Sequence, residues 1–274
     1  MVRRTELLSL LHNPMNMKIL ARNVTTIFPS VSGPVTALKN FNLEVRDGEF
    51  VCIVGPSGCG KSTFLRILAG LLLPTAGEVN ITRGTDAGKP LNSVVFQEYG
   101  IFPWKKVIDN VAFGLQMRGY SKKTRYDIAA DWLERIGLRK FAQYYPHQLS
   151  GGMKQRVSIA RALANDPEVL LMDEPLGALD AQTRTVLQDE LLHIWETHRK
   201  TVVYITHSIE EAVLLGDRVV LMTAHPGTNK VTFDVTIPRP RDIKTTSTTE
   251  FAELSYCIWE ALRDEVMRTL EEQM

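Results

Sequence analysis

Gly55-Pro-Ser-Gly-Cys-Gly-Lys61-Ser62-Thr63 stands between an apolar run at residues 49–54 and a helical pattern at residues 64–69. This order of buried strand, glycine-rich turn and helix start is typical of a phosphate-binding P-loop. The glycines let successive backbone N–H groups converge on phosphate oxygens, and the helix adds the positive end of its dipole. The segment therefore predicts a nucleoside triphosphate site on an α/β core.

The polar side chains of this loop have separate expected roles. Lys61 is placed to reach the β- and γ-phosphates, Ser62 to offer its hydroxyl to Mg²⁺, and Thr63 to lie nearer the α- and β-phosphates. An incidental glycine-rich turn is the alternative, but both flanks disfavour it. The predicted nucleotide-binding residues of the loop are Gly55, Pro56, Ser57, Gly58, Cys59, Gly60, Lys61, Ser62 and Thr63.

Composition narrows the class of protein. The chain has 274 residues, 44% of them hydrophobic and 23% charged, as in an ordinary globular protein. Its formal net charge of +1, without a basic block, argues against nucleic acid as a partner. The three cysteines have no metal-binding spacing, which fits a reducing compartment. No run of about 18 apolar residues could span a bilayer, so we expect any membrane association to go through a partner.

The chain divides into a tail at residues 1–16, one large domain at 17–237, and a C-terminal extension at 238–274. Alternating runs before the P-loop predict two antiparallel strands of a small β-subdomain. Phe28 falls in the loop between them, where its ring either anchors the loop or stacks on adenine. Helical patterns then fill about residues 98–165, and this insertion separates the chain from a compact kinase or a small GTPase.

Two later strands end in polar side chains. The apolar run 168–172 leads into Asp173 and Glu174, and a carboxylate at this place holds Mg²⁺ in P-loop ATPases. Glu174 could polarise a water facing the γ-phosphate, although a surface carboxylate pair is the alternative. His207 follows the strand at 201–206, on the edge of a parallel sheet where ligands bind. Its alternative is an ordinary structural histidine.

The extension has two parts. Residues 238–249 are predicted to be a linker, because prolines, arginines and threonines dominate them. An amphipathic helix follows, which we expect to dock on its own body or on a neighbouring subunit. Its apolar stripe consists of Phe251, Leu254, Ile258, Leu262, Val266 and Leu270.

Several motifs together resemble the ATPase subunits of ABC (ATP-binding cassette) transporters. The resemblance covers about residues 18–237 and implies an α/β P-loop NTPase (RecA-like) core with an antiparallel β-subdomain and an inserted α-helical subdomain. Its motifs stand in family order: the P-loop, Gln97, Leu149-Ser-Gly-Gly152, Asp173-Glu174, Gly177-Ala-Leu-Asp180 and His207.

The segment Ser150, Gly151 and Gly152 opens a helix whose N–H groups form an anion site without a lysine of its own. The resemblance implies that this half-site closes on the γ-phosphate held by another subunit, so that each ATP lies between two chains in a head-to-tail dimer. Asp180 would then brace the interface. Met153 and Ser208 stand where glutamine and aspartate are common, and Phe28 where tyrosine is common, but no catalytic group is lost.

The resemblance also assigns the chemistry. Glu174 would be the general base and His207 would hold the γ-phosphate. Gln97 would couple the nucleotide to the helical block and join Ser62 and Asp173 around Mg²⁺. The expected activity is therefore ATP hydrolysis coupled to transport across a membrane.

The segments 97–104, 107–114 and 32–38 resemble bacterial importers of nitrate, sulfonates or taurine. That resemblance implies a homodimer or a pair with a homologous ATPase subunit, an integral-membrane permease, and indirectly a solute-binding protein, at the cytoplasmic face of the inner membrane. Phe102 and Trp104 either contact the permease or pack inside the helical block. A non-transport cassette protein acting on nucleic acid or ribosomes, and a metabolite kinase, are the alternatives.

Overall fold

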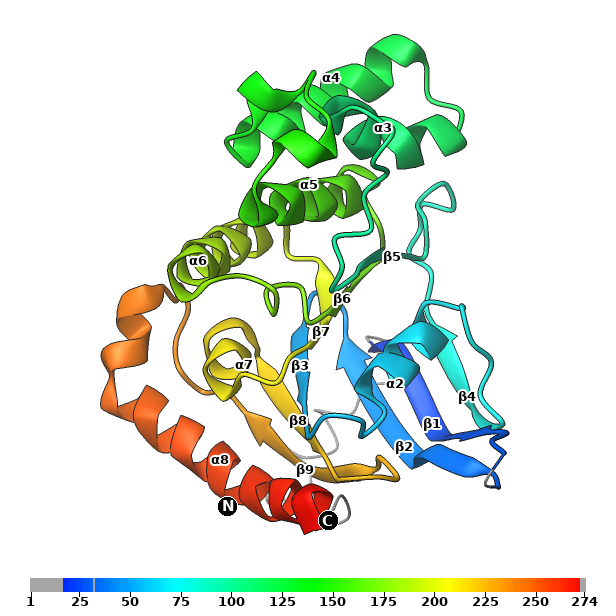
Figure 1. The fold of residues 1–274 in the computed structure, drawn as a ribbon, viewed down its shortest axis with the longest axis vertical. Helices are drawn as coiled ribbons and strands as arrows, with labels where there is room; N and C mark the ends of the chain where they lie inside the picture. The colour runs from blue at the N-terminus through cyan, green and yellow to red at the C-terminus, as the bar shows by residue number, and fades with distance from the viewer. Residues whose placement is uncertain (1–16, 32, 272–274) are drawn as a thin grey trace, which may run out of the picture.

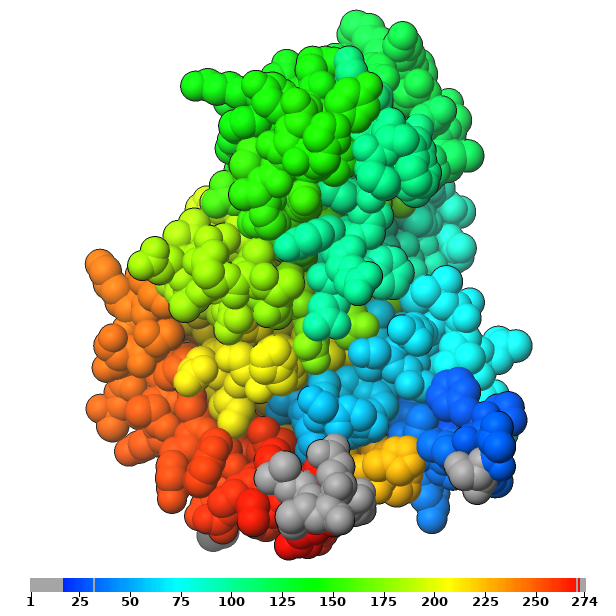
Figure 2. All heavy atoms as spheres, viewed as in Figure 1, coloured from blue at the N-terminus to red at the C-terminus, as the bar shows by residue number. Residues whose placement is uncertain are grey.

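Figure 1 shows the computed structural model, which describes residues 17–31 and 33–271. The predicted tail at 1–16 lies outside the described residues. A central sheet is flanked by a small sheet on one side and by a C-terminal helix on the other, and a block of helices stands at one end. Figure 2 shows this helical block as a green lobe above the body, and the C-terminal segment as an orange to red band along one side.

The central sheet has six strands. Its first five are parallel to one another and the last, β9, is antiparallel to β8. Helices cover both faces, α2 (Lys61–Leu68) on one and α6 (Ala181–His198) with α7 (Ile209–Leu215) on the other. This cover is why the central strands are continuous apolar runs. In spatial order the strands are β5 (Asn92–Val95), β6 (Val169–Asp173), β7 (Thr201–Ile205), β3 (Phe50–Val54), β8 (Arg218–Met222) and β9 (Asn229–Asp234).

The small sheet has three strands, β2 (Val35–Arg46), β1 (Met17–Phe28) and β4 (Ala76–Ile81), all antiparallel to their neighbours. Phe28 is the last residue of β1 and pairs with Val35, so it does not lie in a loop as predicted. Pairing extends this far because β1 and β2 are both 12 residues long and turn back through a short connection.

The helical block consists of α3 (Val107–Met117), α4 (Lys122–Arg135), two 3-10 turns η2 (Arg139–Phe141) and η3 (Pro146–Gln148), and α5 (Gly151–Ala164). It has a hydrophobic core of its own, which includes Val111, Leu133 and Val157. The stretch 139–144, predicted to be helical, forms only one 3-10 turn. The block therefore packs as a separate unit on the central sheet.

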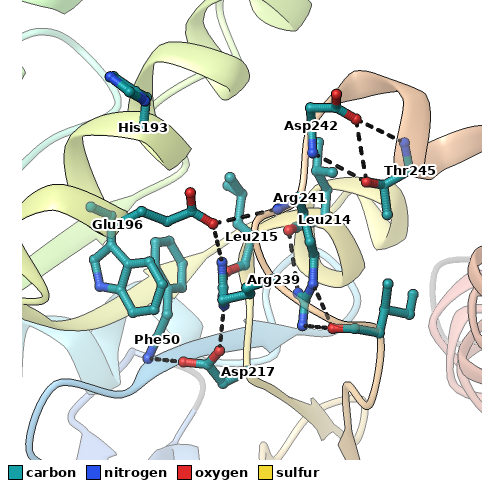
Figure 3. A network of polar contacts seen from close by, with 12 residues as sticks. Phe50, His193, Glu196, Leu214, Leu215, Asp217, Arg239, Arg241, Asp242 and Thr245 are labelled. Atoms are coloured by element: carbon teal, nitrogen blue, oxygen red, sulfur yellow. Dashed lines mark hydrogen bonds and ion pairs between the residues drawn. The ribbon is translucent and has the colours of Figure 1, made fainter.

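The C-terminal extension differs from its prediction at residues 238–249. This segment is no free linker, because the guanidinium of Arg241 is buried and donates to the carbonyl oxygens of Val213, Leu214 and Gly216 at the end of α7. Figure 3 shows Arg241 beside Leu214. The segment includes a 3-10 turn, η4 (Ile243–Ser247), and continues into α8 (Thr249–Glu271).

Helix α8 docks on its own body. Phe251 and Ile258 are buried in the hydrophobic core beside α7, whereas Val266, further along the predicted stripe, is partly exposed. Within the described ranges, no helix combines the length and the apolar character needed to cross a bilayer.

Candidate nucleotide site

The P-loop leaves β3 and enters α2 through a turn that requires glycine. Gly58 and Gly60 have φ angles of 80° and 101°, in the left-handed region. A Cβ at Gly60 would lie 2.7 Å from the carbonyl oxygen of Ala37. Gly60 is also the N-cap of α2 and has no side chain to bond the first N–H groups of the helix. Those groups are therefore available to an anion.

Lys61 lies inside this turn. Its side chain is almost fully buried, and Nζ donates to the carbonyl oxygens of Gly55 at 2.8 Å and Pro56 at 2.9 Å. Burial raises the pKa of the neighbouring Cys59 thiol, although the positive charge of Lys61 opposes the shift. The loop thus concentrates one ammonium and several N–H donors in one place, as a polyphosphate requires.

Ser62 and Asp173 are brought together from distant parts of the chain. The Ser62 hydroxyl donates to Oδ1 of Asp173 at 2.9 Å. Burial raises the pKa of Asp173 above its usual value and the Glu174 charge adds to the shift, whereas the Ser62 hydrogen bond opposes it. A hydroxyl and a carboxylate oxygen side by side fit Mg²⁺, since this ion binds few protein oxygens and keeps the rest for water and phosphate.

Two further predicted residues, Gln97 and His207, converge on one carboxylate oxygen of a third, Glu174. Oε2 of Glu174 lies 3.2 Å from Nδ1 of His207 and 3.5 Å from Nε2 of Gln97. The three residues follow β7, β6 and β5, and the carboxyl ends of parallel neighbours meet at one edge of a sheet. Glu174 has a φ of 44°, and its N–H donates to the carbonyl of Ile205 at 3.0 Å, which fixes the residue on the tip of β6.

The segment 150–152 forms a second helix start. Ser150 is the N-cap of α5, with Oγ accepting from the Met153 N–H at 3.3 Å. Asp180 caps α6 in the same way and accepts from the Thr183 N–H at 2.9 Å, and this hydrogen bond lowers the pKa of Asp180. A Cβ at Gly152 would lie 2.6 Å from the Thr183 methyl group, so the two helix starts are adjacent.

The two predicted anion sites lie at different helix starts, residues 55–63 before and within α2 and residues 150–152 at α5. In the part of the chain that the structure describes, no hydrogen bond or ion pair joins residues 55–63 to residues 150–152. Phe28 is the last residue of β1, and its side chain is partly exposed.

Sequence reasoning missed a buried carboxylate behind His207. Glu211 is 4% exposed and accepts from Thr206 Oγ1 at 2.7 Å, Tyr204 OH at 3.1 Å and Gln188 Nε2 at 3.2 Å. Thr206 Oγ1 in turn accepts from the N–H of Ser208 at 3.0 Å. Burial, together with the Glu211 charge, raises the pKa of Tyr204 well above its usual value. The acid pair Glu210-Glu211 before the apolar run 212–215 was the available signal, and it does not show which of the two is buried.

A groove of about 380 Å³ lies between the end of β5 and the helices α3 and α5. Phe102 lines it, with its ring 4.6 Å from that of Phe113 and 5.6 Å from that of Trp104. The Arg161 guanidinium lies over the Phe102 ring at 5.6 Å. Trp104 is 71% exposed, so Phe102 packs in the groove while Trp104 faces outward.

Comparison with known proteins identifies the family to which this chain belongs. A family model described as ABC transporter matches residues 38–177. The chain belongs to the ABC transporter family. An uncharacterized ABC transporter ATP-binding protein of Methanocaldococcus jannaschii is 49% identical over 261 residues, which are 94% of this chain and 96% of that protein.

Two relatives from Synechocystis carry transport names. The nitrate import ATP-binding protein NrtD is 47% identical over 231 residues, or 84% of this chain and 86% of NrtD. The bicarbonate transport ATP-binding protein CmpD is 49% identical over 227 residues, or 80% of this chain and 79% of CmpD.

Solved ABC cassettes confirm the predicted fold. The dimeric structure of a bacterial ABC transporter cassette superposes with a TM-score of 0.70 at 36% identity, covering 80% of this chain and all of that one. A related dimeric structure, of a post-hydrolysis state bound to ADP and Pi, also has a TM-score of 0.70, at 35% identity. This ABC protein is accordingly an ATP-binding, ATP-hydrolysing subunit, as the sequence predicted.

Proposed function

We propose that this ABC protein energises an importer of a small solute, with nitrate as the first candidate. The nitrate and bicarbonate relatives support a small oxyanion as the transported solute. Sulfonates and taurine are further candidates, because the segments 97–104 and 107–114 resemble importers of these solutes. The proposed ATP hydrolysis rests on one observation: Gln97 and His207 both contact the Glu174 carboxylate beside the P-loop.

In this proposal ATP lies along residues 55–63, with the Phe28 ring stacked on adenine. The flexible Lys61 side chain turns from the Gly55 and Pro56 carbonyls toward the β- and γ-phosphates, which are stronger partners for an ammonium. Magnesium, held by Ser62, Asp173 and Gln97, would neutralise charge on the phosphates.

Hydrolysis uses the carboxylate at the tip of β6. Glu174 takes the proton of a water whose oxygen attacks the γ-phosphorus, and the bond to the β-phosphate oxygen breaks as ADP leaves. His207, whose ring lies 3.2 Å from that carboxylate, donates to a γ-phosphate oxygen and fixes the group for in-line attack.

Each complete site is proposed to need two chains. Ser150, Gly151 and Gly152 of one copy would cover the γ-phosphate held by the P-loop of another, with Asp180 bracing the contact between them. The dimeric state of the related cassette supports this arrangement. A homologous ATPase subunit could take the place of the second copy.

The groove beside Trp104 is proposed to receive a helix of a membrane permease, which would place the protein at the cytoplasmic face of the inner membrane. The permease would in turn receive solute from a solute-binding protein. The net charge of +1 argues against nucleic acid as a partner. Trp104→Ala should reduce co-purification with the permease, whereas Val186→Ala, at an exposed apolar position on α6, should not.

Uptake in intact cells tests the function. Deleting the gene for this chain should abolish energy-dependent accumulation of labelled nitrate, and a wild-type copy should restore it while a Glu174→Gln copy should not. Bicarbonate and taurine, supplied in parallel, serve as the other candidate solutes. Unchanged uptake of all three would remove the importer assignment.

A further inference from the structure

The C-terminal helix α8 contacts the turn between β8 and β9 through one buried carboxylate. Glu265 is 2% exposed and accepts from the N–H of Ala224 at 2.9 Å and from Nζ of Lys230 at 2.7 Å, with Arg268 at 3.6 Å. Burial raises the pKa of Glu265, but Lys230, the Ala224 N–H and Arg268 outweigh it, so the pKa lies below its usual value. The group is therefore an anion at neutral pH.

The same turn packs on the P-loop. Gly227 donates to the carbonyl of Ala37 at 3.0 Å and accepts from the Lys39 N–H at 3.0 Å. A Cβ at Gly227 would overlap the carbonyl oxygen of Cys59, the residue two positions before Lys61. The turn thus touches the phosphate-binding backbone directly, without a side chain between them.

The turn itself is stiff. Thr223 Oγ1 donates to the Pro226 carbonyl at 3.0 Å and accepts from the Thr228 N–H at 3.0 Å. A displacement of Ala224 would therefore move Gly227 as well. Residues 223–228 form a rigid spacer with α8 on one side and the P-loop on the other.

The extension that carries α8 is anchored at its start. Arg239 donates to Oδ1 of Asp217 at 2.8 Å and to the Leu215 carbonyl at 2.6 Å, next to the carbonyl contacts of Arg241 (Figure 3). Since Ile258 is fully buried as well, Glu265 is held by a helix that is fixed to the core over much of its length. All of these residues lie beyond the stretch 38–177 that matches the family model.

We propose that Glu265 is a positioning residue for the P-loop: by holding Ala224 it fixes the β8–β9 turn against Cys59, and the C-terminal helix thereby raises the affinity of the site for nucleotide. The inference rests on the proposed binding of ATP at residues 55–63. Glu265 touches no reacting atom and has no step in the hydrolysis.

The test is titration of the full-length protein with a fluorescent ATP analogue. Glu265→Ala leaves the Ala224 N–H without its acceptor, so the dissociation constant should rise about tenfold. Glu260→Ala, an exposed acid on the same helix, should leave it unchanged, and Glu265→Gln should recover most of the affinity because its amide oxygen still accepts. An affinity in Glu265→Ala equal to wild type would overturn the proposal.

Hydrogen exchange separates positioning from simple stabilisation and needs no variant. Coupling is reciprocal, so if the turn sets nucleotide affinity, a non-hydrolysable ATP analogue must slow exchange of the Ala224 amide in the wild-type protein. Identical exchange of this amide with and without the analogue would contradict the proposal, even if Glu265→Ala failed to fold.

Lys61→Ala separates failure of this inference from failure of the site assignment. The variant should lose the analogue altogether, because it lacks the ammonium of the P-loop. With binding lost in Lys61→Ala, an unaltered affinity in Glu265→Ala contradicts only the role of Glu265. Undiminished binding by Lys61→Ala would overturn the proposed nucleotide site and, with it, the inference.

Discussion

Nδ1 of His207 lies 3.2 Å from Oε2 of Glu174, although 33 residues separate them in the chain. The contact exists because β6 and β7 are parallel neighbours whose carboxyl ends carry these two residues. It places an acid and an imidazole together at the ligand-binding edge of the sheet, next to the P-loop.

Glu174→Gln should abolish turnover and keep ATP binding. The amide occupies the same space but cannot take a proton from water, so we expect the hydrolysis rate to fall by at least about a hundredfold. Phosphate release measures the rate, and gel filtration with ATP should reveal an accumulated dimer. Glu210→Gln, an exposed acid near His207, is the control and should hydrolyse normally. Steady hydrolysis by Glu174→Gln would show that another group is the base.

Glu211→Ala should both destabilise the fold and impair hydrolysis. It leaves the buried Tyr204 hydroxyl and Gln188 amide unpartnered and frees Thr206, whose Oγ1 holds the backbone beside His207. We expect a loss of about 2 to 4 kcal/mol in the free energy of unfolding. Urea denaturation measures it, with Glu210→Ala as the control. Equal free energies of unfolding for Glu211→Ala and Glu210→Ala would show that the hydrogen bonds to Glu211 do not stabilise the fold.

Asp173→Asn should stabilise the protein in the absence of nucleotide and metal. Burial raises the folded-state pKa of Asp173, so the folded state binds more protons than the unfolded state between the two pKa values. The free energy of unfolding therefore falls as pH rises through that window, and a neutral amide removes this cost at pH 7. Thermal denaturation should show a higher midpoint for Asp173→Asn, while hydrolysis with Mg²⁺ should be lost.

Asp166→Asn is the comparison variant, because the pKa of Asp166 is lowered whereas that of Asp173 is raised. Burial raises the pKa of Asp166, but hydrogen bonds from Lys200 and Lys89 outweigh it and lower the pKa. Its contribution to stability is present above the unfolded-state pKa and is lost as pH falls through the folded-state value. Asp166→Asn should therefore lower the midpoint at pH 7. A shift of the thermal midpoint in the same direction for Asp173→Asn and Asp166→Asn would contradict these two expectations.

Arg241→Lys should destabilise the protein although the charge is kept. Burial lowers the pKa of Arg241 to about 10, so its guanidinium is still charged at neutral pH and bonds several carbonyls at once. An ammonium cannot reproduce this planar set of donors. We expect a loss of about 3 kcal/mol by urea denaturation and faster proteolysis of residues 238–271. Arg263→Lys, at an exposed position on α8, should behave as wild type.

The nucleotide-binding loop could be predicted from sequence because its chemistry is local. Glycines at fixed spacing, a lysine and a helix start stand within nine consecutive residues, and Asp173 is the last residue of β6, directly after an apolar run. The membership of β4 in the small sheet could not be predicted in this way, since its pairing with β1 is a long-range property.

Residues that act through distant partners could not be found in this way. The stretch around Arg239 and Arg241 has the composition of a linker, and only the end of α7 shows where their guanidinium groups bind. Glu211 and Glu265 each stand beside another acid, Glu210 and Asp264, in a helix, where a solvent-exposed acid is the usual interpretation. Their burial depends on how α7 and α8 pack, which no local pattern encodes.

We propose that each hydrolytic centre combines the P-loop of one chain with residues 150–152 of another. Mixing two inactive variants tests it most directly: Lys61→Ala disables the P-loop, and Ser150→Arg, at an exposed helix start, blocks the second anion site. Each alone should be inactive, and an equal mixture should regain up to about a quarter of the wild-type rate, since half of its dimers contain one intact centre. A mixture no more active than its components, or a fully active Ser150→Arg variant alone, would contradict the claim.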